Sequence, residues 1–209
     1  MVGYRGKRLL DLVITVPALI ALSPVMAVVA VLVARRMGRP VLFSQARPGL
    51  DEQPFPVYKF RTMKEAYDAV GQPLPDRDRL TALGRFLRAT SLDELPGLLN
   101  VVKGEMSLVG PRPLVTKYLP YYTQRERIRC AVRPGITGWA QVNGRNDLPW
   151  DQRLACDVWY VEHCSLVLDL KILGMTVGKV LRRANVQVDT AMNEPDLSVE
   201  RHDRRVTAA

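Results

Sequence analysis

The sequence predicts a mainly α-helical fold with a small β element (α+β), in which a re-entrant helix-break-helix membrane hairpin precedes a globular domain that carries interfacial amphipathic helices. Three observations lead to this fold class. An uncharged, apolar run extends from Leu12 to Ala34, and Ser23-Pro24 interrupts it near its middle. Basic residues flank the run at both ends. Beyond the run, β-prone segments are short, and most of the remaining chain has helical periodicity.

The apolar run is long enough to cross a bilayer, but its details favour a hairpin. As one straight helix it would be about 34 Å long, against a hydrocarbon core of roughly 30 Å. Pro24 lacks a backbone donor, so we expect a break or kink there, with the Ser23 hydroxyl bonding a freed carbonyl. Cationic flanks favour the cytoplasmic side, and residues 5–8 and 35–39 are both basic. From the residues alone, a re-entrant hairpin over residues 9–34 and a kinked transmembrane anchor both stay open.

The rest of the chain divides into a domain and a tail. We expect a membrane hairpin with basic flanks at residues 1–38, a catalytic globular domain at 39–186 and a polar, disordered tail at 187–209. The predicted elements of the domain are a strand-turn-strand unit (41–43 and 55–60), an exposed loop (65–79), helices (80–89, 91–103, 116–129, 150–163 and 166–183) and polar loops (133–138 and 141–147). The basic helices 116–129 and 166–183 are expected to lie along the membrane surface.

Composition narrows the classes of function. A formal net charge of +9 favours anionic partners such as phospholipids or nucleotides. The three cysteines form no CxxC pair and the two histidines lie far apart, which argues against a zinc site. The sequence contains no P-loop, no GxGxxG dinucleotide motif and no GxSxG nucleophile elbow.

The adjacent carboxylates Asp93 and Glu94 are the strongest candidates for catalytic chemistry. A purely structural explanation competes with this one, because Ser91-x-x-Glu94 matches a helix capping box. Pro96 would be tolerated in the first helical turn if Asp93 were the N-cap. A carboxylate can anchor Mg²⁺ or attack phosphorus to form an acyl phosphate.

Several cations accompany the two carboxylates along the chain. Lys59 and Arg61 lie in one short basic segment, Arg85 and Arg88 precede the pair, and Arg112 lies between two prolines. Phosphoryl transfer requires cations on the phosphate oxygens, an acidic metal anchor and a nucleophile in line with the leaving group. Taken singly, each of these arginines is more often a solvated surface charge. These cations can form a phosphate-binding site only if the fold brings them together.

These residues fall in motifs that resemble one family. The segments are Lys7–Asp11 (KRLLD), the apolar run with Ser23-Pro24, Phe43–Gly49 (FSQARPG), Tyr58–Met63 (YKFRTM), Thr90–Pro96 (TSLDELP), Met106–Pro113 (MSLVGPRP), Arg133–Trp139 (RPGITGW) and Asp157–Tyr160 (DVWY). In this order, over residues 5–183, they resemble the bacterial sugar transferases of the monotopic phosphoglycosyl transferase superfamily. The length is similar to that of the small, PglC-like members.

The resemblance implies a reaction and roles for residues. Asp93 would attack the β-phosphate of a UDP-sugar and release UMP, and polyprenyl (undecaprenyl) phosphate would then take the covalent phosphosugar. Asp93 and Glu94 would be catalytic and would share Mg²⁺. The resemblance assigns phosphate or substrate contacts to Lys59, Arg88, Arg112, Arg145 and Asp157, and places the nucleotide or sugar pocket near residues 133–139.

The resemblance also implies a location and partners. The family hairpin breaks at the Ser23-Pro24 position and enters the bacterial inner membrane from the cytoplasmic face, with phospholipids and no nucleic acid as partners and a homodimer as one state. The product would be the first membrane-bound intermediate of a glycoprotein, O-antigen, capsule or exopolysaccharide. Two other classes stay open: a basic scaffold that binds nucleic acid or anionic lipid, and a phosphodiesterase that hydrolyses nucleotide sugars.

Overall fold

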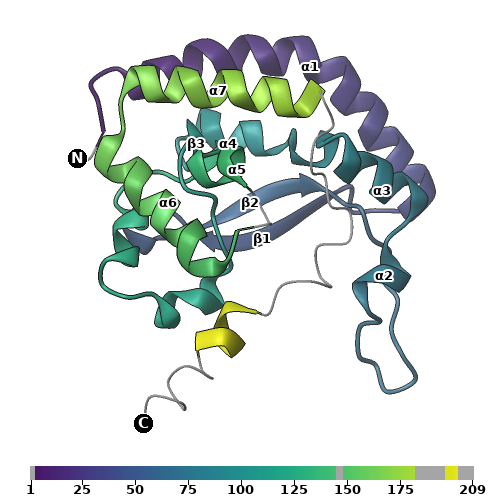
Figure 1. Cartoon of the computed structure of the whole chain (residues 1–209). Coiled ribbons are helices and arrows are strands. Elements are labelled where there is room, and N and C mark those ends of the chain that lie inside the picture. Colours follow the sequence, from purple (N-terminus) through teal and green to yellow (C-terminus); the bar gives the residue numbers. More distant parts are fainter. Residues whose placement is uncertain (1–2, 145–147, 182–195, 202–209) are drawn as a thin grey trace.

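A computed structural model describes residues 3–144, 148–181 and 196–201 of the chain (Figure 1). The fold is mainly helical with two small sheets, as predicted. The elements are the helices α1 (Lys7–Met37), α2 (Asp76–Arg79), α3 (Ala82–Ala89), α4 (Gly97–Lys103), α5 (Trp139–Asn143), α6 (Trp150–His163) and α7 (Leu166–Leu181), the strands β1 (Leu42–Pro48), β2 (Pro54–Phe60), β3 (Ser107–Val109) and β4 (Gly135–Thr137), and the 3-10 helices η1 (Leu50–Glu52), η2 (Leu92–Glu94), η3 (Thr116–Tyr121) and η4 (Glu126–Cys130).

The apolar run forms one continuous helix, α1, and not two helices separated by a break. Pro24 removes the N–H that would bond the Ile20 carbonyl four residues earlier, and the Ser23 hydroxyl donates to that same carbonyl at 2.8 Å. The side chain thus replaces the lost backbone bond, and the helix bends without interruption (Figure 1). The predicted break is therefore corrected to a bend.

Both ends of α1 pack on the globular domain. Near its start, the buried Asp11 carboxylate accepts hydrogen bonds from the Ser107 hydroxyl and the Leu108 amide, each at 2.9 Å. Near its end, Val29 and Val33 pack in one cluster with residues of β2 and α3. Among the described helices α1 alone is long and apolar enough to cross a membrane, and the window that qualifies is only 11% buried.

The predicted strand-turn-strand unit is confirmed as an antiparallel hairpin of β1 and β2, with Phe43 opposite Lys59. The fully buried Asn100 ties this hairpin to α4. Its side chain accepts from the Tyr58 amide and donates to the Pro56 carbonyl. The hairpin is thereby held beside the segment that carries Asp93 and Glu94.

A parallel pair of short strands, β3 and β4, was not predicted. Residues 133–138 were expected to form only a turn-rich loop, but Gly135–Thr137 pairs with Ser107–Val109. A Cβ at Gly135 would lie 2.1 Å from the Gly110 amide nitrogen, so this close approach of two backbones requires glycine. The pairing fixes the path of the chain that carries Arg112.

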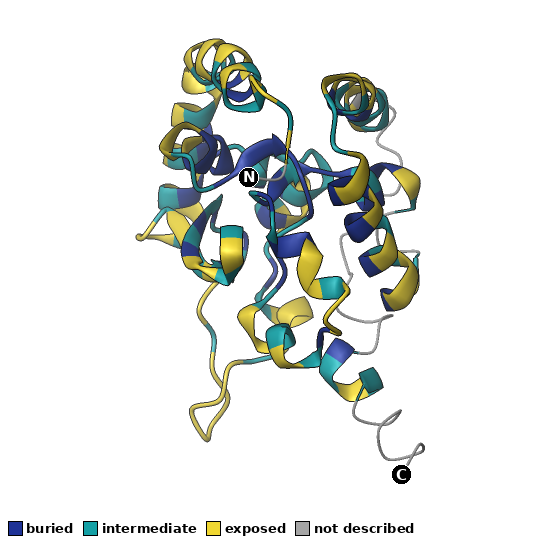
Figure 2. Ribbon diagram, turned by 90° about the vertical axis from the view of Figure 1, so that its left-hand side faces the viewer, coloured by how far each residue is buried: buried dark blue, intermediate teal, exposed yellow. Residues whose placement is uncertain are grey.

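The helix predicted over 116–129 is wrong, because two 3-10 helices, η3 and η4, occupy the segment and Pro120 lies inside the first. Both lie on the side of the molecule opposite α1 and α7 (Figure 1), so they do not share a surface with the apolar helix. The helix Trp150–His163 is confirmed as α6. The described part of the helix predicted at 166–183 is α7, which exposes apolar residues such as Val167 and Val177. It lies on the same side of the molecule as α1 (Figure 1), and Figure 2 shows the two helices apart from each other.

Part of the C-terminal tail is ordered. Residues 196–201 pack against the domain, where Leu197 is fully buried and Arg201 pairs with Glu126 and Asp151, each at 2.7 Å. The remainder of the predicted tail lies outside the described residues. The disorder predicted for residues 187–209 therefore does not apply to 196–201.

Candidate active site

Asp93 and Glu94 lie on a 3-10 turn and not at the start of a regular helix. The α-helix that follows begins only at Gly97, after Pro96. Ser91 has a left-handed backbone (φ 56°), and its side chain makes no capping hydrogen bond. The capping-box explanation is therefore wrong. A left-handed serine beside two carboxylates is instead the kind of local strain that clusters at functional sites.

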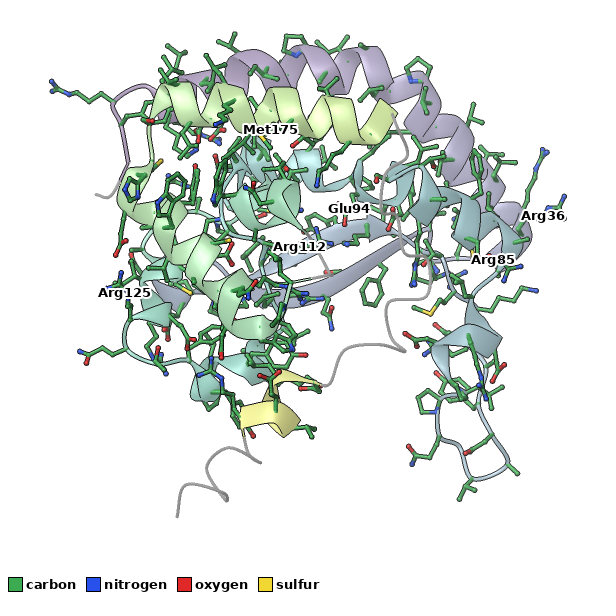
Figure 3. All side chains as sticks on the ribbon, in the orientation of Figure 1. Arg36, Arg85, Glu94, Arg112, Arg125 and Met175 are labelled. Carbon is green, nitrogen blue, oxygen red and sulfur yellow. The ribbon has the colours of Figure 1, made fainter. Side chains whose placement is uncertain are left out.

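Glu94 is held by two cations from distant parts of the chain. Lys59 on β2 donates to its Oε1 atom at 2.7 Å, and Arg112 donates to the same oxygen at 2.8 Å. Figure 3 shows Glu94 and Arg112 together in the interior of the domain, between α7 and the hairpin. Burial alone would raise the pKa of Glu94, but the two cations lower it far below its ordinary value. Glu94 is therefore ionised throughout the physiological range.

Asp93 has a different environment. Its side chain is only 8% exposed, and within the described ranges it has no hydrogen-bond or ion-pair partner. Burial and the adjacent Glu94 charge raise its pKa to about 6, against the lowering effect of Lys59, Arg88 and Arg112. The Asp93 carboxylate is thus close to cations, largely ionised at neutral pH and not engaged by another side chain, as a nucleophile requires.

Arg88 reaches the pair from α3, whose placement depends on close packing. Thr81 caps this helix by accepting from the Gly84 amide at 2.9 Å. A Cβ at Gly84 would lie 1.9 Å from the Thr62 carbonyl oxygen, so only glycine allows the helix to approach the end of β2. The Arg88 Nε atom donates to the Thr62 hydroxyl at 3.1 Å, which orients the guanidinium.

A cavity of about 520 Å³ adjoins Glu94 and is rich in positive charge. Arg47, Lys59 and Arg112 line it together with Glu94 as the one carboxylate among its described lining residues. Sequence reasoning missed Arg47, because Arg47-Pro-Gly49 reads as a turn. Burial and the nearby Arg112 charge lower the pKa of Arg47. Like charges brought this close favour an anion between them.

Comparison with known proteins identifies the chain. A family model described as bacterial sugar transferase matches residues 2–183. The chain belongs to the bacterial sugar transferases. The expected family and enzyme class are confirmed.

Three relatives illustrate the similarity of this sugar transferase to others. It is 51% identical to the uncharacterized sugar transferase EpsL of Bacillus subtilis, over 87% of this chain and 90% of that protein. It is 40% identical to the exopolysaccharide production protein ExoY of Sinorhizobium fredii, over 86% of this chain and 87% of that protein. It is 42% identical to the undecaprenyl-phosphate galactose phosphotransferase of Salmonella typhimurium, over 85% of this chain but only 40% of that protein.

Not every predicted residue lies at the site of this sugar transferase. Asp157 is 2% exposed and pairs with Arg129 at 2.7 Å. Arg129 in turn donates to the Arg112 carbonyl oxygen at 2.7 Å, so Asp157 supports a cation of the site and does not line the cavity. Arg85 lies well apart from Glu94 (Figure 3). Arg145 lies outside the described residues.

The two carboxylates of the sugar transferase fit a Mg²⁺ ion. In the described part of the chain no three His, Cys, Asp or Glu side chains cluster as metal ligands. Mg²⁺, however, commonly uses one or two carboxylates together with waters and substrate phosphates. Both cations contact Oε1 of Glu94, which leaves Oε2 and the Asp93 carboxylate as oxygen donors.

Proposed function

We propose that this sugar transferase moves a sugar-1-phosphate from a UDP-sugar to polyprenyl (undecaprenyl) phosphate and releases UMP. The observation that carries the proposal is the cavity in which three cations face one carboxylate, next to an Asp93 that has no ion-pair partner among the described residues. Such an excess of positive charge suits a diphosphate. The Salmonella relative is an undecaprenyl-phosphate galactose phosphotransferase by name, which supports the choice of acceptor.

Asp93 is the proposed nucleophile. Its carboxylate oxygen attacks the β-phosphorus of the donor, the bond from that phosphorus to the bridging oxygen breaks, and UMP leaves with the bonding electrons. An oxygen of the lipid phosphate then attacks the same phosphorus and displaces Asp93, giving a polyprenyl-diphosphate sugar. Lys59, Arg88 and Arg112 hold the phosphate oxygens, where charge develops during both steps.

Asp93 and the free oxygen of Glu94 are the proposed holders of Mg²⁺. The ion would offset the negative charge of the diphosphate and of the departing UMP. Glu94 also keeps Lys59 and Arg112 together, because both donate to one of its oxygens. Chelation with EDTA should abolish UMP release, and added Mg²⁺ should restore it; full activity in EDTA would refute the metal requirement.

The proposed membrane topology is re-entrant, in the bacterial inner membrane with the domain on the cytoplasmic face. Asp11 near one end of α1 and Val33 near the other both pack on the same domain, which disfavours ends on opposite faces of a bilayer. The exposed apolar middle of the helix would dip among phospholipid chains. In intact cells, cysteines placed at Arg5 and Arg36 should both resist a membrane-impermeant thiol reagent; labelling of only one would indicate a transmembrane span.

The reaction is tested by UMP release from a panel of UDP-sugars with undecaprenyl phosphate. Asp93→Asn should abolish turnover and prevent a covalent sugar-phosphate adduct on the protein, detectable by intact mass. Asp68→Asn, in the exposed 65–79 loop, is a matched control that should retain activity. Turnover by Asp93→Asn at the wild-type rate would refute the proposed nucleophile. UMP release in excess of enzyme without acceptor would favour the phosphodiesterase instead.

The proposed product is a membrane-bound intermediate of glycoconjugate synthesis. The similarity to the Sinorhizobium protein named for exopolysaccharide production points to that branch. The UDP-sugar that releases UMP in the panel will identify the first sugar of the glycan.

A further inference from the structure

A second cavity lies on the other side of Glu94. Its volume is about 820 Å³, and Glu94 and Ile136 line both cavities. Its walls come from the end of α3, the start of α4, α5 and the C-terminal part of α7. Glu94, next to Asp93, therefore lies between two spaces, and each space can hold a different substrate.

The two cavities differ in chemistry. Three cations line the first, whereas the second combines uncharged polar side chains with apolar walls that include Leu95, Leu98 and Val142. Among the described lining residues of the second cavity, Lys179 of α7 is the single cation. Within the described ranges Lys179 has no ion-pair partner, and the charge of Glu94 is already matched by Lys59 and Arg112. This combination suits a ligand with one phosphate and a long apolar body.

The second cavity is also continuous with the apolar surface of the molecule. Val180 lines the cavity and is still 51% exposed. It belongs to α7, which exposes further apolar residues such as Val167 and Val177 and lies on the same side of the molecule as the apolar α1 (Figures 1 and 2). Val180 therefore offers an apolar chain a path from the exposed face of α7 into the cavity.

We propose that the second cavity is the binding site of the lipid phosphate acceptor, with Lys179 as the cation of its phosphate and the apolar walls around its first isoprene units. The inference rests on the proposed function. The diphosphate of the UDP-sugar occupies the cation-rich cavity. To displace Asp93 in line, the attacking oxygen of the lipid phosphate must take the position that UMP leaves, so the acceptor phosphate reaches past Glu94 from the second cavity after UMP departs. The two substrates therefore enter by separate routes, one from water and one from the membrane surface.

The proposal predicts a selective effect of Lys179→Gln. The two half-reactions are measured separately in a neutral detergent: the UMP burst without acceptor, which reports attack on the donor, and the dependence of steady-state turnover on undecaprenyl phosphate. Lys179→Gln should leave the burst unchanged and raise the KM for undecaprenyl phosphate about tenfold or more, as loss of a hydrogen bond to a charged group implies. Lys171→Gln is the matched control, because Lys171 lies on the same helix but does not line the cavity.

A second pair of variants tests the apolar entrance without loss of charge. Val180→Trp should narrow it and raise the KM for the lipid phosphate but not for the UDP-sugar. Val177→Trp, on an equally exposed position of the same helix outside the cavity, should change neither. Both positions are exposed, so the variants are expected to fold.

The outcomes separate this inference from the proposed function. Absence of any UMP burst in the wild-type protein would overturn the proposed function itself. A normal burst with an unchanged acceptor KM in Lys179→Gln would overturn the acceptor site alone. Equal effects of Lys171→Gln and Lys179→Gln would indicate a general attraction of anionic lipids and would also overturn it.

Discussion

The environment of Asp93 predicts an unusual dependence of stability on pH. Its pKa is raised to about 6 from an ordinary value of 3.8, chiefly by burial. The folded protein therefore binds a proton at this group more tightly than the unfolded chain does. For a raised pKa, the stabilisation is complete below the unfolded value and is lost as pH rises through the folded value. The ionised Asp93 thus destabilises the fold at neutral pH.

The perturbation that tests this is Asp93→Asn, which removes the titration while keeping the size of the side chain. Between pH 8 and pH 5 the free energy of unfolding of the wild-type protein should rise by about 1.4 kcal/mol relative to the variant, from linkage with the two pKa values. For a chain of this size that corresponds to about 3–5 °C in melting temperature. Titrations common to both proteins cancel in the difference.

The assay is chemical denaturation in one detergent at several pH values, followed by tryptophan fluorescence. Asp196→Asn provides a control, because the pKa of Asp196 is lowered whereas that of Asp93 is raised. Despite some burial, hydrogen bonds from Lys117 and Ser198 lower the pKa of Asp196 to about 2, so its contribution is lost only in stronger acid. The stability difference between the wild-type protein and that control should stay constant from pH 8 to pH 5. A constant difference for Asp93→Asn as well, or one of reverse sign, would refute the reasoning.

Three further predictions concern activity and packing. Donor turnover should fall as pH drops through about 6, because the nucleophile must be ionised, and a flat UMP burst from pH 8 to pH 5 would contradict this. Gly84→Ala should displace α3 and with it Arg88, reducing the rate of the UMP burst at least about tenfold for a shift near 1 Å, whereas an unaltered rate would show that the Thr62 backbone gives way. Asp157→Asn should leave the buried Arg129 unpaired and destabilise the fold by about 3–5 kcal/mol in denaturant titration; a loss under about 1 kcal/mol would mean that the buried pair contributes little.

Short-range rules predicted several elements well. The hairpin follows from β-prone segments around Pro48-Gly49, and α6 follows from helical periodicity between Pro149 and Cys164. The segment 116–129 shows the limit of such rules. Its composition suits a helix, but Pro120 and packing against α6 and β1 select two 3-10 turns. A break was predicted at Ser23-Pro24, but α1 is continuous there, and the Ser23 hydroxyl bonds the Ile20 carbonyl that Pro24 leaves free.

The sequence identified most residues of the site, but not how they contact one another. Asp93 and Glu94 were recognised as a pair, yet their different pKa values arise from which cations touch each of them. Arg47 was missed because a basic residue beside a turn is usually solvated. The sequence analysis assigned a substrate contact to Asp157, but in the structure Asp157 forms a buried ion pair with Arg129.

By itself, the sequence determined the features that depend on neighbouring residues and on rare motifs: the apolar helix, the carboxylate pair, the β1–β2 hairpin and the family. Tertiary structure alone decided which charges meet. Lys59 and Glu94 are 35 positions apart, and Glu94 and Arg112 are 18 apart, so only folding brings them within 3 Å. The strength of an ionic contact depends on distance and on exclusion of water, and neither quantity is encoded in the local order of residues. The tertiary structure also decides that the site has two cavities, one of them rich in cations.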